Sequence, residues 1–197
     1  MKVVAYQMNG RDLPLDHGYP VRAIVSGHYG MASVKWLTQV HVVREPFRRY
    51  WQTSDYGYWE SADGNPVRRP LGEMKLKSEI FRPRVHEALA PNYVYTVFGS
   101  AWAGETDVTH VAVNTDGGQT WAEAEFLDAV RRYAWRRWTY RWLTPKGPGR
   151  YTLMARARGA DGSVQPEGHD ERYGTYVIHH PLPIDVFVER AAAINGA

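Results

Sequence analysis

Apolar and polar residues alternate along much of this chain, and a period of two residues predicts β-strands rather than helices. In the first part of the chain, the alternation predicts strands at residues 21–25 and 34–43. Residues 44–73 break the pattern with Pro and Gly, so we expect an irregular connecting loop there. Residues 1–73 therefore offer little that could bury a core, and we expect them to be the end of a larger domain.

Beyond residue 74 the alternation becomes regular, and turn residues separate the apolar runs. Residues 116–118, Asp-Gly-Gly, predict a tight hairpin turn. Residues 122–132 are a weak helix candidate, although their first residues also suit a strand. About seven short strands at this spacing are typical of an immunoglobulin-like β-sandwich, so the expected fold class is mainly β. The predicted strands are 74–81, 93–103, 108–114, 121–125, 138–143, 151–158 and 184–189.

Composition limits the chemistry that this chain can perform alone. The 197 residues include no Cys, which rules out disulfides, thiolate metal sites and Cys nucleophiles within the chain. The net charge of +3 gives no strong field toward nucleic acid or an anionic membrane. No signal peptide and no apolar run of about 18 residues is visible. We expect a soluble protein, cytoplasmic as given, and periplasmic if a longer form is exported.

The densest group of candidate functional residues lies at 16–37. His17, Arg22 and Lys35 supply donors for an oxyanion, and the glycines at 27 and 30 let backbone N–H groups approach a ligand closely. Arg offers a planar fork suited to phosphate, and Lys offers a mobile point charge. The alternative is a Gly/Pro turn that carries three ordinary surface cations, and composition alone favours that alternative.

The order of the motifs adds a family resemblance. AYQMNG at 5–10, DHGYPVR at 16–22, GHYGMASVKWL at 27–37 and WQTSDY at 51–56 resemble, in that order, the end of the molybdopterin domain in the sulfite oxidase family. The resemblance implies that His17 and Arg22 hold the pterin and its phosphate, and that Ser33 and Lys35 belong to the same binding stretch. It also implies that Tyr56 is the family's active-site tyrosine, beside the molybdenum. A phenol suits such a place because it can donate a hydrogen bond and relay a proton.

The second half of the chain resembles the dimerisation domain of the same family. AWAG at 101–104, VAVNTDGGQTW at 111–121 and the Gln165-Pro166 pair carry this resemblance. It implies a homodimer formed through the sandwich. We therefore divide the chain into a remnant of an α+β molybdopterin-binding domain with its connecting loop, 1–73, and an immunoglobulin-like Mo-co oxidoreductase dimerisation domain, 74–190.

Two departures from the family limit the expected function. The family's metal-binding Cys lies in an earlier part of the molybdopterin domain, so we expect the C-terminal portion of a molybdenum-cofactor oxidoreductase that transfers oxygen atoms. Alone, the chain is expected to bind no cofactor and to be inactive, and an upstream molybdopterin segment would be its partner. The alternative is a non-enzymatic homodimerisation module from a truncated gene. Glu105 and Asp107 stand near the place of a substrate-binding arginine, which puts sulfite in doubt but leaves other oxo-transfer substrates open.

Two further groups of residues have ordinary explanations. Residues 131–142 mix Arg with Trp and Tyr, as some nucleic-acid surfaces do. Alternation predicts instead that Trp138, Tyr140 and Trp142 face a core while Arg137 and Arg141 face outward, so we expect no nucleic-acid partner. Neighbouring residues of a strand point to opposite faces, so His179 and His180 are not expected to share a metal ion.

Overall fold

The computed structural model describes residues 2–189. The chain divides into two compact units, and the segment Asp170–Ile178 groups with the first unit although it follows most of the second in sequence. Unit 1 contains residues 1–74 and 170–178, and unit 2 contains residues 75–169 and 179–197. No helix within residues 2–189 combines the length and apolar character needed to cross a membrane.

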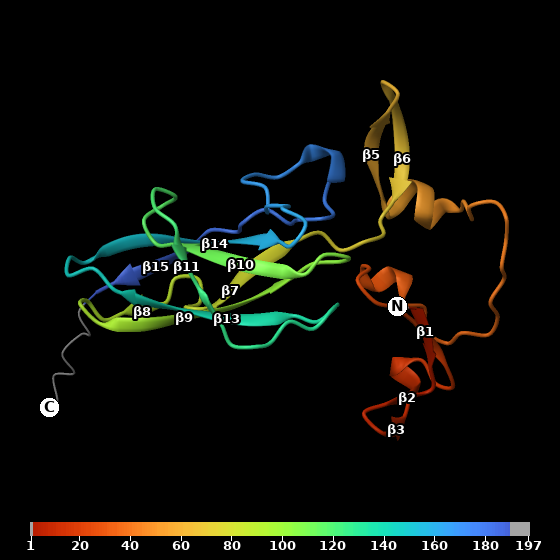
Figure 1. Cartoon of the computed structure of the whole chain (residues 1–197), viewed down its shortest axis with the longest axis horizontal. Coiled ribbons are helices and arrows are strands. Elements are labelled where there is room, and N and C mark those ends of the chain that lie inside the picture. Colours follow the sequence, from red (N-terminus) through yellow and green to blue (C-terminus); the bar gives the residue numbers. More distant parts are fainter. Residues whose placement is uncertain (1, 190–197) are drawn as a thin grey trace, which may run out of the picture. The chain divides into compact units, whose positions relative to one another are not determined.

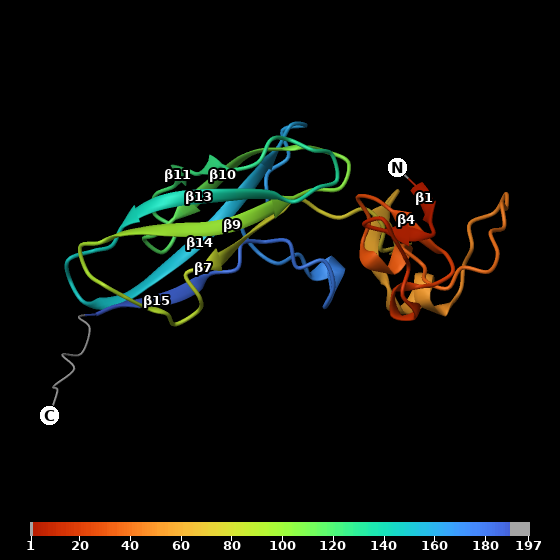
Figure 2. The ribbon, with the colours of Figure 1, turned by 90° about the horizontal axis from the view of Figure 1, so that it is seen from below.

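Unit 2 is a sandwich of two β-sheets (Figures 1 and 2). One sheet has the order β11-β10-β14-β15-β8, and the other has the order β12-β13-β9-β7. The mainly β, immunoglobulin-like expectation is confirmed. The strands are β7 (Lys77–Arg82), β8 (Ala88–Leu89), β9 (Val94–Trp102), β10 (Val108–Asn114), β11 (Ala122–Glu123), β12 (Glu125–Phe126), β13 (Arg136–Leu143), β14 (Gly149–Gly159) and β15 (Ile184–Val188).

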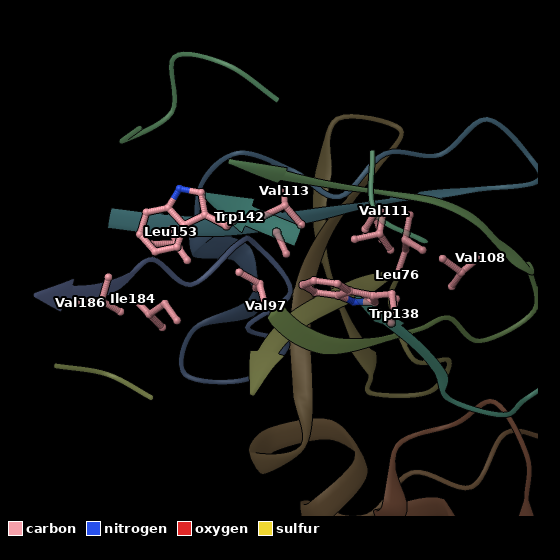
Figure 3. Close-up of a cluster of buried hydrophobic side chains, with 14 of the residues drawn as sticks. Leu76, Val97, Val108, Val111, Val113, Trp138, Trp142, Leu153, Ile184 and Val186 are labelled. Atoms are coloured by element: carbon pink, nitrogen blue, oxygen red, sulfur yellow. The ribbon is translucent and has the colours of Figure 1, made fainter. Parts of the chain in front are cut away.

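The core lies between the two sheets, where the inward-facing residues of each strand meet (Figure 3). Trp138 is fully buried, and its indole N–H donates a 3.0 Å hydrogen bond to the hydroxyl of Ser78. Gly99 lies directly opposite Trp138 on β9, and a Cβ at Gly99 would overlap the indole ring. The predicted alternation of β13 is confirmed, because Trp138 and Trp142 are buried while Arg137 and Arg141 are exposed.

A buried glutamine joins the two sheets of the sandwich. The Gln165 Oε1 atom accepts hydrogen bonds from the backbone N–H of Ser78 on β7, at 2.9 Å, and of Ala157 on β14, at 3.1 Å. Gln165 is 1% exposed, so both N–H groups would be buried without a partner if this side chain were absent. Gln165 therefore has a structural role in unit 2.

Unit 1 is built from small paired strands and short helical turns. Strand β1 pairs with β4, β2 pairs with β3, and β5 pairs with β6 in a hairpin. The prediction of a strand at 21–25 is confirmed by β4. The elements are β1 (Lys2–Ala5), β2 (Gln7–Met8), β3 (Arg11–Asp12), η1 (Leu15–His17), β4 (Arg22–Val25), η2 (Gly30–Ala32), the π-helix η3 (Trp51–Asp55), β5 (Gly57–Ala62), β6 (Asn65–Pro70) and, from the segment 170–178, η4 (Glu171–Tyr173).

Three local predictions were wrong. The expected strand at 34–43 is not formed. The carbonyl oxygen of Val34 accepts a hydrogen bond from Ala23 in β4, and the N–H of Leu37 donates to Val21 just before β4. Residues 38–43 are exposed. The expected loop at 44–73 contains η3 and the β5–β6 hairpin. The helix candidate at 122–132 instead contributes β11 and β12, because its first residues pair with β10 and then with β13.

Candidate cofactor-binding and active site

The first candidate site begins at the η1 turn, which ends at Gly18 with φ of +105°. A Cβ at Gly18 would lie 3.1 Å from the Cβ of Lys35 and 3.2 Å from the Cβ of Arg22. Gly18 therefore allows the turn to pack against the stems of both cationic side chains. His17, the last residue of the turn, is exposed.

Arg22 holds two other predicted residues by their backbone. From β4, its Nη1 donates to the carbonyl oxygen of His17 at 3.1 Å, and its Nη2 donates to that of Ser33 at 3.4 Å. The Nε atom of Arg22 is buried without a hydrogen-bond partner among the residues that the structure describes. A buried, unpaired charged donor is costly, and a bound acceptor would satisfy it.

Ser33 and Lys35 follow the η2 turn, and both contact the segment around Arg22. The Ser33 hydroxyl accepts a hydrogen bond from the backbone N–H of Val25 at 3.1 Å. The Lys35 ammonium donates to the carbonyl oxygen of Asp16 at 2.8 Å, and it also lies 4.5 Å from the Trp36 ring centroid. The structure thus brings His17, Arg22, Ser33 and Lys35 into one cluster, which we call the cationic cluster.

The donor set of the cationic cluster fits an anionic group. The hydrogen bonds of Arg22 and Lys35 go to backbone carbonyl oxygens, which carry no full charge that would neutralise these cations. Each side chain also has further N–H donors, because a guanidinium carries five and an ammonium three. A phosphate-bearing cofactor such as molybdopterin matches this chemistry.

Tyr56 lies in a second cluster, at the end of the π-helix η3. Its backbone N–H donates to the carbonyl oxygen of Trp51 at 2.7 Å, and its own carbonyl oxygen accepts from Leu71 at 2.8 Å. The ring of Tyr56 stacks on Trp51 with centroids 5.7 Å apart, and lies 5.5 Å from the ring of Tyr176. The half-buried phenol is therefore held between two aromatic neighbours.

Asp55 and Tyr176 were missed as site residues by the sequence analysis. Burial raises the pKa of the Tyr176 phenol, and the charge of the nearby Asp55 carboxylate raises that pKa further. Asp55 precedes Tyr56 in the WQTSDY motif, so its neighbourhood was visible in the sequence. Tyr176 had no comparable signal, because its position depends on the fold of a segment far along the chain.

Two family models match most of the chain. Residues 1–51 match the family described as the oxidoreductase molybdopterin binding domain, and residues 68–173 match the Mo-co oxidoreductase dimerisation domain. Mitochondrial sulfite oxidase from Homo sapiens is 36% identical over 84% of this chain. This chain belongs to the sulfite oxidase family.

A second relative and a solved structure extend this comparison. Sulfite oxidase from Gallus gallus is 34% identical over 84% of the chain. The crystal structure of the sulfane dehydrogenase SoxCD from Paracoccus pantotrophus superposes on 97% of the chain, and on 51% of its own chain, with a TM-score of 0.80 and 25% identity. The chain spans 32% of the human protein and 38% of the chicken protein, so about a third of the length of these relatives.

Glu105, which was expected to disfavour sulfite, is paired in unit 2. The Glu105 carboxylate accepts 3.0 Å hydrogen bonds from the guanidinium of Arg132 and from the hydroxyl of Tyr133. The hydrogen bond from Arg132, followed by the one from Tyr133, lowers the pKa of Glu105. Arg132 therefore compensates the charge of Glu105.

The remaining candidates take structural positions in unit 2. The rings of His169 and His180 contact each other edge to face with centroids 5.6 Å apart, and burial lowers the pKa of His180. Within residues 2–189, no three His, Asp or Glu side chains gather closely enough to hold a metal ion. The Arg-rich stretch is largely strand β13, whose tryptophans are core residues.

Proposed function

We propose that this chain supplies one wall of a molybdopterin pocket, together with a dimerisation domain, in an enzyme that transfers oxygen atoms. The observation that carries the proposal is the cationic cluster, in which Arg22 and Lys35 keep their charges unneutralised beside the Gly18 turn. When bound, the molybdenum–pterin group would supply the redox centre for oxygen-atom transfer.

The chain's own residues would bind that group and handle a proton beside it. The remaining N–H donors of Arg22 and Lys35 would bind the phosphate, and the exposed imidazole of His17 would contact the pterin. Because the Ser33 oxygen accepts from Val25, its hydroxyl proton is directed away from that N–H and is free to be donated. The Tyr56 phenol would hold a proton at its Oη atom next to the reacting centre.

The cofactor proposal is tested in the longest natural form of the protein by measuring its molybdenum and pterin content. The variant Arg22→Met should lose most of both, because it removes the planar donor that also holds His17 and Ser33. Arg11→Met is the matched control, because Arg11 is an exposed residue of β3 outside the cluster. Equal cofactor content in the Arg22 variant and the control would contradict the proposal.

We also propose that the 197-residue chain by itself is inactive, since it contains no cysteine to ligate molybdenum. The chain should contain no stoichiometric molybdenum and should not reduce a dye with sulfite or another oxo-acceptor substrate. Stoichiometric metal with turnover would overturn this statement. Dimer formation without molybdenum, even when upstream segments are present, would identify the chain as a dimerisation module only.

The homodimer is proposed to form through the outer face of the four-stranded sheet. Val94 and Leu143 pair directly on that face, and both are exposed, as is the nearby Phe81. Arg137 and Arg141 are exposed on the same face, and the outer face of the five-stranded sheet carries Arg156 and Arg158. Sedimentation should show a dimer that Leu143→Lys weakens and Arg158→Glu leaves intact. A monomer, or a dimer weakened only by Arg158→Glu, would refute this assignment.

A further inference from the structure

The segment Asp170–Ile178 brings two tyrosines to the hairpin that follows the π-helix. It belongs to unit 1, although residues 75–169 separate it from the rest of that unit in sequence. The ring of Tyr173 lies 4.9 Å from that of Tyr58, and the ring of Tyr176 lies 5.5 Å from that of Tyr56. Tyr56 and Tyr58 flank Gly57, at the base of the β5–β6 hairpin beside η3 (Figure 1).

The segment has its own local order, which holds these tyrosines in place. The carboxylate of Asp170 accepts from the backbone N–H of Arg172 and caps η4, and it also pairs with the Arg172 guanidinium. The backbone N–H of Tyr176 donates to the carbonyl oxygen of Tyr173 at 3.0 Å. Val177 is buried, so the end that carries Tyr176 is anchored by packing as well as by hydrogen bonds.

Tyr176 contacts Tyr56 directly and lies close to the residue before it. Its ring packs at a tilt of 60° on the ring of Tyr56, on which Trp51 is stacked at 29°. Burial first, and then the charge of the nearby Asp55 carboxylate, raises the pKa of the Tyr176 phenol. The ring of Tyr56 is thus held between Trp51 and Tyr176.

We propose that Tyr176 is a positioning residue whose ring sets the orientation of the Tyr56 phenol. The inference rests on the proposed function for its catalytic meaning, because Tyr56 would be the group that acts on the substrate. A proton donor must be held at the correct angle, and a displacement of about 1 Å can lower a rate by about 100-fold. The segment 170–178 therefore serves as a support for the active site, supplied from a distant part of the chain.

The orientation itself is measured without any cofactor, by NMR of the full 197-residue chain labelled with ¹³Cζ-tyrosine. Tyr56→Phe assigns the Tyr56 resonance. Tyr176→Ala should shift and broaden that resonance, because the neighbouring ring is lost. Tyr176→Phe keeps the ring and removes only the hydroxyl group near Asp55, so it should restore most of the original shift.

Tyr173→Ala is the matched control, because it removes the equivalent contact to Tyr58. It should move the Tyr58 resonance and leave that of Tyr56 in place. If Tyr176→Ala leaves the Tyr56 resonance unchanged, or if Tyr173→Ala moves it equally, the inference is wrong. If Tyr176→Ala does not fold, Tyr176→Phe and Asp55→Asn must still shift the Tyr56 resonance by a small amount, and no shift overturns the inference.

Turnover by the complete, molybdenum-containing protein separates this inference from the proposed function. Tyr176→Ala should lower kcat about 10-fold or more with little change in KM, since positioning acts on the chemical step. Unchanged turnover in Tyr56→Phe would refute the proposed role of Tyr56, whereas the NMR result would still decide whether Tyr176 positions it.

Discussion

The ammonium group of Lys35 donates a 2.8 Å hydrogen bond to the backbone carbonyl oxygen of Asp16, nineteen positions earlier in the sequence. This contact joins the two motifs of the cationic cluster, one before β4 and one after it. It also keeps the lysine charge near the η1 turn without neutralising it. The spacing between the two motifs matters because it allows Lys35 to reach Asp16.

Lys35→Met should weaken cofactor retention more than it weakens folding. One charge-assisted contact contributes about 1.5–3 kcal/mol, so we expect binding of a phosphate-bearing cofactor to weaken roughly 10- to 100-fold. Pterin content after gel filtration of the complete protein measures the effect. Lys2→Met, at an exposed position of β1, is the control. Equal pterin content in the two variants would show that Lys35 does not contribute to cofactor binding.

Gly18→Ala should destabilise unit 1 by about 1–3 kcal/mol. The substitution places a Cβ at a left-handed residue and presses it against the stems of Arg22 and Lys35. Gly10→Ala is a matched control, since Gly10 has φ of +76° but open space around its Cβ position. Denaturant midpoints should be lower for the Gly18 variant than for the Gly10 variant. The same loss in both would mean that backbone strain alone, and not the contact, makes Gly18 necessary.

Gln165→Ala should lower the unfolding free energy of the sandwich by about 2–5 kcal/mol. The variant leaves the buried N–H groups of Ser78 and Ala157 without an acceptor, and each such loss costs about 1–3 kcal/mol. Urea unfolding followed by tryptophan fluorescence measures the change. Gln119→Ala, at an exposed loop position, should stay within about 0.5 kcal/mol of the wild type. A similarly small effect at Gln165 would show that the two sheets do not depend on this bridge.

The loop between β10 and β11 should make stability depend on acid pH. Hydrogen bonds from Thr120, first from its side chain and then from its backbone, lower the pKa of Asp116 from 3.8 to about 2. Because the folded pKa is depressed, this stabilisation is complete above pH 4 and is lost as the pH falls from about 4 to 2. Asp116→Asn should lose less stability than the wild type over that interval, as measured by urea midpoints. Parallel losses would contradict the assignment.

The local sequence pattern was sufficient to predict which residues of a strand are buried where the two faces of the strand differ in environment. In β13 the alternation of Trp and Arg specifies which residues enter the core, and Trp138 is buried as expected. The segment 34–43 shows the limit of the same argument. It alternates equally well, but a strand also needs a partner edge, and only residues 34–37 find one beside β4.

The β5–β6 hairpin was not predicted from the sequence, for a different reason. Its cross-strand neighbours include Trp59 with Arg68 and Tyr58 with Arg69, so the pairing combines aromatic and cationic side chains on a largely exposed ribbon. Such a ribbon has no buried face that would impose an apolar alternation on its sequence. Its prolines and glycine are typical of loops, and for that reason the sequence predicted a loop there.

The sequence by itself determined the family, the β-sandwich and the residues of the cationic cluster, because ordered motifs and strand alternation are local properties of the chain. Tertiary structure alone decided that Arg132 compensates Glu105, that Gln165 joins the two sheets, and that Tyr176 contacts Tyr56. Each of these contacts joins residues far apart in sequence, and no local pattern records a contact that exists only after the chain has folded.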